Sequence, residues 1–380
     1  MGIAKLSTEL LQKIYEYSDL LDILHLSQTS KRNYNALRGR YSPIIRQALE
    51  DAYGPIPSLV KLIISDESLK AKSVISTGIR RDNTLDRLLR VSDEPFLSPQ
   101  MLVKMVKFGR VASRWVEIFP QFRWRVDYQN RRFLRPHEQQ RLRRAIYNYW
   151  TYGTLFHDET YTNFNPDLPS YLDSQPATTF MNFMPSSPAE NGDHRLRLIQ
   201  SYSTIEIVQL EEFLQHVVKL IEIDLYPSDS IILAQHNFTS QAVEKIAWGH
   251  GGRYRDLVKN LLKYNPVDLV YLYDQTFTKL ERVEYMNARE LGINNTPATL
   301  GQAILCVTEK RRRDELESHE SSYSHPHIRH RFHQVMYQSH GSCVQGENLK
   351  FGIADHPDAE RYSEDHPFNN DGKIVFSDDI

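Results

Sequence analysis

Apolar residues recur every three or four positions along most of this chain, which is the period of an α-helix and not of a β-strand. The clearest example runs from residue 136 to residue 156, and its stripe comprises Leu142, Ala145, Ile146, Tyr149, Trp150, Gly153 and Phe156. Arg141, Arg144 and Asn148 lie off this stripe. Strand patterns are sparse, the best being residues 373–376. The sequence therefore predicts a mainly α protein.

The same spacing, together with proline and serine at expected helix starts, predicts helices elsewhere. These helices cover residues 58–64, 99–119, 204–225, 239–248, 254–264, 266–274 and 297–317. Pro120 is expected to end the second of them, because proline removes a backbone hydrogen bond from a helix.

Length and pattern together predict three regions, since 380 residues exceed one average domain. We expect an N-terminal helical module in residues 1–45 and a larger, irregular helical domain in residues 46–317. Residues 157–194 contain five prolines and no sustained period, which predicts a long irregular loop. Residues 318–380 are polar and rich in histidine, so we expect a flexible, weakly ordered tail.

The amino-acid composition argues against several classes of protein. The chain is 40% hydrophobic and 25% charged, as in ordinary globular proteins, which argues against collagen and wholesale disorder. No run of about 18 apolar residues and no signal-peptide core is present, so no membrane span is expected. We expect a cytoplasmic or nuclear protein, with Lys310–Arg313 either a nuclear import signal or a charged helix end. Cys306 and Cys343 alone do not make a disulfide framework or a cysteine-rich zinc site.

The first forty residues hold three short amphipathic segments separated by turn signals. Ser7 or Thr8 can cap the first segment, and the second, from Leu20 or Leu21 to Leu26, is almost continuously apolar. A segment of this size cannot bury so many leucines by itself. The pattern therefore predicts that a partner surface covers part of it.

The order of these residues resembles the F-box. The family pattern is Leu-Pro-x-Glu-Leu, an Ile, then Asp-Leu-Leu-x-Leu followed by Thr or Val, Ser, Lys and an aromatic residue. The chain fits it without a gap through Leu6-Ser7-Thr8-Glu9-Leu10-Leu11, Ile14, Asp22-Ile23-Leu24-His25-Leu26, Thr29-Ser30-Lys31 and Tyr34. Ser7 stands where the family usually has Pro, and Ser18 where it usually has an apolar residue. Both departures are expected to weaken docking without abolishing it.

The resemblance implies a module that docks a Skp-family adaptor, and through it a cullin, in a ubiquitin ligase. The residues that carry over to the F-box core and adaptor face are Leu6, Ser7, Leu10, Leu11, Ile14, Leu20, Ile23, Leu24, Leu26 and Tyr34. The expected function is a substrate-recognition subunit that presents an unknown protein target for ubiquitination. Two alternatives are an F-box protein that acts outside a ligase and a helical cap that packs only on its own chain.

A second, less specific resemblance lies in the predicted central helix. Residues 141–150, with Phe156 after them, are similar to the helical region that follows the F-box in many filamentous-fungal F-box proteins. This resemblance implies no particular substrate, and the stripe is explained more simply as a core helix.

Charge is unevenly distributed, because residues 1–150 carry 26 of the 46 Lys and Arg but 15 of the 48 Asp and Glu. Their formal charge is +11, and that of the remaining residues is −13. Arginines and aromatic residues alternate between residues 110 and 144, which suggests a patch for an anionic ligand at Arg123, Arg125, Arg131 and Arg132. A nucleic-acid-binding function is therefore an alternative, although apolar periodicity favours core helices and disfavours nucleic acid. The acidic part could also pair with these arginines within the molecule.

No sequence motif for catalysis, a metal or a cofactor is apparent. The chain has no Gly-x-Ser-x-Gly elbow or His-Glu-x-x-His pair, and its histidine cluster, His325, His327, His330 and His333, lies in polar surroundings without an obvious frame for a metal. We therefore expect a non-catalytic subunit with no cofactor.

Overall fold

The computed structural model describes residues 6–70, 84–92, 95–157, 193–235, 240–289, 298–322 and 352–355. The predicted irregular loop of residues 157–194 and the predicted tail of residues 318–380 fall largely outside these residues. The suggested strand at residues 373–376 and the histidine cluster lie outside them as well.

Across the described ranges the chain forms helices and no strand, which confirms the predicted mainly α class. The first half contains α1 (Thr8–Glu16), α2 (Leu20–Thr29), α3 (Lys31–Arg38), α4 (Tyr41–Tyr53), α5 (Ile56–Lys70), α7 (Pro99–Arg123) and α8 (Pro136–Phe156). The second half contains α9 (His194–Gln200), α10 (Thr204–Lys219), the π-helix η7 (Leu220–Leu225), α11 (Asp229–Gln235), α12 (Ser240–Ile246), α13 (Gly251–Leu261), α14 (Pro266–Gln275), α15 (Lys279–Ala288) and α16 (Leu300–Ser322). None of the described helices is both long and apolar enough to cross a membrane.

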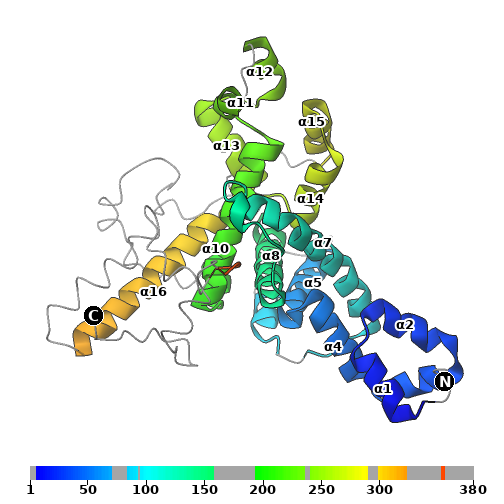
Figure 1. The fold of residues 1–380 in the computed structure, drawn as a ribbon. Helices are drawn as coiled ribbons and strands as arrows, with labels where there is room; N and C mark the ends of the chain where they lie inside the picture. Colours follow the sequence, from blue (N-terminus) through cyan, green and yellow to red (C-terminus); the bar gives the residue numbers. More distant parts are fainter. Residues whose placement is uncertain are drawn as a thin grey trace.

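Helix α8 lies at the centre of the molecule, with α5, α7 and α10 packed around it (Figure 1). Its side chains from Ala145 to Tyr152 are all buried, so it is enclosed on more sides than a single apolar stripe requires. The hydroxyl groups of three buried tyrosines of α8 form hydrogen bonds with three different parts of the chain. Tyr147 donates to the Tyr53 carbonyl (2.7 Å), Tyr149 to the Leu262 carbonyl (2.8 Å), and Tyr152 pairs with the Thr299 hydroxyl (2.8 Å).

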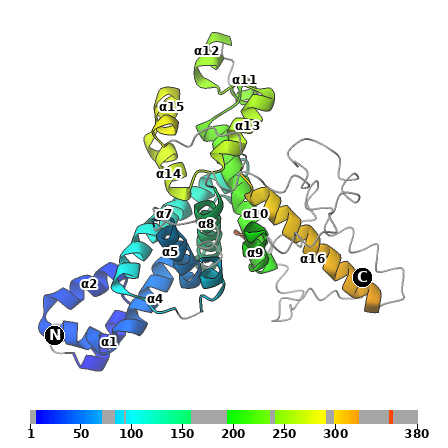
Figure 2. The same ribbon diagram turned by 180° about the vertical axis from the view of Figure 1, so that it is seen from behind.

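The helices α1 to α3 project at one end of the molecule, while α11 to α15 lie at the opposite end (Figures 1 and 2). Helix α4 joins the projecting helices to the rest, because it packs against α1, α2 and α3 on one side and against α5 and α7 on the other. Its Ile44, Ile45, Ala48 and Leu49 are buried. The predicted domain boundary at residue 45 therefore falls inside a helix, and one apolar core continues across it.

A close approach between α4 and α7 holds this connection in place. A Cβ atom placed on Gly109 of α7 would lie 2.3 Å from Cγ of Tyr53 at the end of α4. That separation is shorter than any normal contact, so glycine is required where the two helices meet.

One expectation about a single residue is wrong, and one polar residue is buried off the predicted stripe. Pro120 does not end α7, which continues to Arg123, because its last turn is fixed by buried Phe119 and Phe122 and closed by a bond from the Trp124 amide to the Pro120 carbonyl (3.2 Å). Asn148 lies off the predicted apolar stripe but is 2% exposed, since α8 is enclosed by several helices.

Gly109→Ala should destabilise the fold by about 1–3 kcal/mol, because the added methyl group forces α4 and α7 apart. Gly252→Ala on α13 is the matched control, since a Cβ there meets nothing within 4 Å. Its effect should stay within about 0.5 kcal/mol. Urea unfolding followed by circular dichroism measures both, and equal stability of the two variants would contradict this account of the helix contact.

Candidate docking face on helices α1 to α3

Each of the three N-terminal helices begins at a side chain that accepts a hydrogen bond from the backbone of its first turn. Ser7 accepts from the Leu10 amide (3.4 Å), Asp19 from the Asp22 amide (2.7 Å) and Ser30 from the Asn33 amide (3.2 Å). Such caps satisfy amide groups that a helix cannot pair internally. Ser7, which replaces the usual proline of the F-box pattern, is therefore a helix cap in this chain.

The three helices share a small core with α4. Leu11, Tyr15, Ile23, Ala36 and Leu37 are buried there. The Tyr15 hydroxyl donates to the Asn33 carbonyl (3.1 Å), which ties α1 to α3, and burial raises the pKa of this phenol. Two further contacts lie at the edge of this core. Glu16 forms an ion pair with Arg40, and the side-chain amide of Gln12 donates to the Ala36 carbonyl (3.3 Å).

Ser18, the second departure from the F-box pattern, ends α1 rather than entering this core. Its hydroxyl donates to the Ile14 carbonyl one turn earlier (2.7 Å). The half-buried hydroxyl is thus satisfied without a partner protein.

Helix α2 leaves most of its apolar surface uncovered. Of its five aliphatic residues only Ile23 is fully buried, while Leu20 and Leu26 are half-buried. Leu21 and Leu24 are 56% and 42% exposed. Aliphatic residues make up five of the ten residues of α2, and large aliphatic side chains exposed together in this way are typical of an interaction surface.

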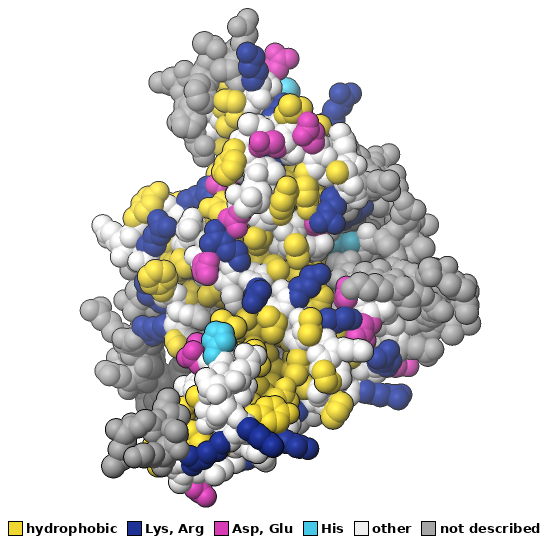
Figure 3. Space-filling model, turned by 90° about the vertical axis from the view of Figure 1, so that its right-hand side faces the viewer, with side chains coloured by type: hydrophobic (Ala, Val, Ile, Leu, Met, Phe, Trp, Pro, Cys, Tyr) yellow, Lys and Arg dark blue, Asp and Glu magenta, His cyan; other side chains and the backbone are white. Residues whose placement is uncertain are grey.

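Helix α1 also carries exposed apolar residues. Leu10 is 52% exposed and Tyr17 is 87% exposed, and each lies about one helical turn from half-buried Ile14. These three residues line an open groove together with Leu6, Lys13 and Ser18. Figure 3 looks onto the side of the molecule where α1 and α2 lie in Figure 1, and shows hydrophobic patches between Lys and Arg side chains. Exposed apolar groups concentrated in this way are typical of interaction surfaces.

The ten residues predicted for the F-box core and adaptor face therefore fall into three groups. Leu11 and Ile23 are buried core residues. Leu6, Ile14, Leu20 and Leu26 are half-buried, and Ser7, Leu10, Leu24 and Tyr34 are exposed. We call the exposed and half-buried apolar surface of α1 and α2 the docking face, comprising Leu6, Leu10, Ile14, Tyr17, Leu20, Leu21, Leu24 and Leu26. Tyr17 and Leu21 were not among the predicted residues, although helical spacing from Leu10 and Leu24 places them beside those residues.

Three of the four arginines of the predicted anionic-ligand patch contact carboxylates of this chain. Arg123 lies 3.4 Å from Glu212, Arg125 forms an ion pair with Asp224, and Arg132 contacts Glu138 through two bonds of 2.6 Å. Arg131, which is exposed, is the one member of the four for which the described residues provide no side-chain ion pair. The pairs of Arg123 and Arg125 thus join the basic part of the chain to its acidic part, as the charge asymmetry suggested, whereas Arg132 and Glu138 both belong to the basic part.

One group of side chains has the composition of a metal site. Ligand atoms of His137, Glu138 and Asp355 lie within 4.8 Å of one another. Both Glu138 oxygens already accept hydrogen bonds from Arg132, and one each from the Arg135 and Asp355 amides (2.6 Å each). The bonds from Arg132 and the two amides outweigh the opposing effect of burial and hold the pKa of Glu138 below its usual range. The group therefore holds Asp355 against α8. The Glu138 carboxylate already accepts four hydrogen bonds, so it has no lone pair free to bind a metal ion.

Comparison with known proteins adds no relative: no family model, no curated protein and no solved structure matches the chain. The F-box resemblance consequently rests on the residues of α1 to α3 and on the surface they form.

Leu11→Ala should cost about 2–5 kcal/mol of unfolding free energy, because it leaves a cavity in the core beneath the docking face. Leu10→Ala, its neighbour on the exposed side of α1, should cost less than about 1 kcal/mol. Urea denaturation at equilibrium measures both. Similar losses in the two variants would show that the docking face is buried by this chain itself.

Proposed function

We propose that this chain is an F-box protein, the substrate-recognition subunit of a ubiquitin ligase, and that the docking face binds a Skp-family adaptor. The observation that carries the proposal is the incomplete burial of α2, where only Ile23 of five aliphatic residues is fully buried and Leu21 and Leu24 are exposed. Helices of an adaptor laid against this face would remove that surface from water, which is the main driving force for association.

In this proposal the protein performs no chemistry. It joins a target to the adaptor, and through the adaptor to a cullin, so that a lysine of the target meets the ubiquitin-carrying enzyme at high local concentration. The larger helical part beyond α4 would bind the target. The proposal also requires that the chain work in the cytoplasm or the nucleus.

The exposed position of the docking face allows a clean mutational test. Leu10→Asp with Leu24→Asp should weaken binding of a purified Skp-family adaptor at least 100-fold, a loss of about 2.7 kcal/mol, because both charges would be buried at the interface. The fold should persist, since both side chains face solvent in the free chain. Affinity is measured by biolayer interferometry with the chain immobilised.

Phe277→Asp with Leu280→Asp provides a matched control, because these side chains at the opposite end are 77% and 67% exposed. This variant should bind the adaptor like the wild type. Absence of binding by the wild-type chain, or equal binding by both variants, would contradict the proposal. Adaptor binding without recruitment of a cullin would instead support an F-box protein that acts outside a ligase.

A further inference from the structure

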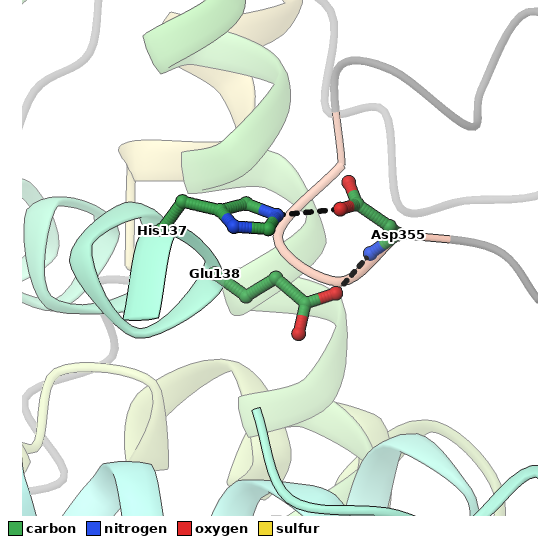
Figure 4. A group of neighbouring side chains, drawn as sticks. All are labelled: His137, Glu138 and Asp355. Carbon is green, nitrogen blue, oxygen red and sulfur yellow. Dashed lines mark hydrogen bonds and ion pairs between the residues drawn. The ribbon is translucent and has the colours of Figure 1, made fainter. Parts of the chain in front are cut away.

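Four residues far along the chain, Gly352 to Asp355, are seated against α8 and α10 (Figure 4). Twenty-nine residues separate them from the last residue of α16. Ile353 is fully buried and Ala354 is 5% exposed. The segment therefore occupies a site on the folded helices in the way that a short peptide ligand would.

The backbone of the segment is recognised by charged side chains. The Ile353 amide donates to a Glu212 carboxylate oxygen (2.5 Å), and the Asp355 amide donates to Glu138 (2.6 Å). In return Arg132 donates to the Asp355 carbonyl (3.2 Å) and Arg141 to the Gly352 carbonyl (3.4 Å). The amides of Ile353 and Asp355 thus meet two carboxylates, and the chain bends at Gly352, Ile353 and Ala354 to present them.

Two side chains of the segment add selectivity. The Ile353 side chain belongs to the apolar core cluster, which restricts this position to an aliphatic residue. The Asp355 carboxylate accepts from Arg141 (2.7 Å) and lies 2.5 Å from Nε2 of His137. These bonds outweigh burial and keep the pKa of Asp355 below its usual range. The site consequently distinguishes an acidic residue two positions after an aliphatic one.

The recognising carboxylates are held by groups outside the segment. Arg132 pairs with Glu138, and Arg123 lies beside Glu212. Burial raises the pKa of Glu212, while the Ile353 amide and the charges of Arg123 and Arg141 act in the opposite direction. The site is thus built from α7, α8, α10 and the connection between α7 and α8, and the segment supplies only its occupant.

We propose that this site, formed by Arg132, His137, Glu138, Arg141 and Glu212, is a recognition site for short, bent peptide segments of partner proteins that carry an aliphatic residue followed two positions later by Asp or Glu. Residues 352–355 are its intramolecular occupant and compete with such partners. Because the occupant belongs to the same chain, its local concentration is high and a partner segment must displace it. The proposal does not depend on adaptor docking at α1 to α3.

A fluorescein-labelled peptide with the sequence of residues 350–357 tests the proposal by fluorescence polarisation. The receptor is the full chain carrying Ile353→Asp and Asp355→Lys, which disable its own segment. This double variant should bind the peptide saturably, and the wild-type chain should bind it at least tenfold more weakly. Adding Arg141→Ala to the double variant should lower the affinity at least tenfold, and a peptide with the same two changes should not bind.

The wild-type chain carrying Asp358→Asn, three positions beyond Asp355, is the matched control and should bind like the wild type. Failure of a folded double variant to bind the peptide would overturn the proposal, as would equal binding of both peptides. If the double variant does not fold, Asp355→Asn, which retains Ile353, should increase peptide affinity at least threefold over the wild type. Loss of folding in that variant as well would show the segment to be an integral part of the core and would also overturn the proposal.

Discussion

The enclosure of α8 is the constraint on which the rest of the structure depends. A helix buried along most of its circumference must find a hydrogen-bonding partner for each polar group that it carries inward. The tyrosines of α8 find theirs on three separate parts of the chain, the end of α4, the end of α13 and the start of α16. The position of α8 therefore sets the positions of the helices around it, including α4, which carries the N-terminal helices outward.

Ion pairs between distant parts of the chain stabilise the same packing of helices. Arg114 pairs with Asp274 (2.7 Å), Arg123 lies beside Glu212 (3.4 Å) and Arg141 pairs with Asp355 (2.7 Å). Each of these contacts joins the basic part of the chain to its acidic part. Because the pairs are partly exposed, each contributes modestly to stability, and their main effect is to fix which surfaces meet. Apolar side chains without a covering partner include Leu10, Tyr17, Leu21 and Leu24 at the end formed by α1 and α2.

Periodicity predicted most of the elements that bury a continuous apolar stripe, but not α4, which buries Ile44, Ile45, Ala48 and Leu49. Helices α7, α8, α10 and α14 were all predicted, and prolines in the first turns of α7, α8 and α14 helped to locate their starts. Helix α15, which contains no fully buried residue, was not predicted either. The burial of Asn148 could not be predicted from the sequence either, because it depends on helices that are distant in sequence.

The two candidate sites differ in how far the sequence could predict them. The leucine density of residues 6–26 is local, so it indicated both a core and a surface that needs a partner, although it could not separate Leu10 from Leu11. The contacts of Glu138, Glu212 and Asp355 join residues up to 223 positions apart. No local pattern marks such a site, and the opposite charges of the two parts of the chain were its only trace in the sequence.

Hydrogen–deuterium exchange of the full-length chain with and without a purified Skp-family adaptor tests the central claim most directly. The account predicts that the adaptor slows exchange in peptides from α1, α2 and α3, whose apolar surface it covers, and leaves α8 unchanged. Unaltered exchange in α1 to α3 at saturating adaptor, or protection spread equally over the whole chain, would contradict the claim that these helices form a docking face.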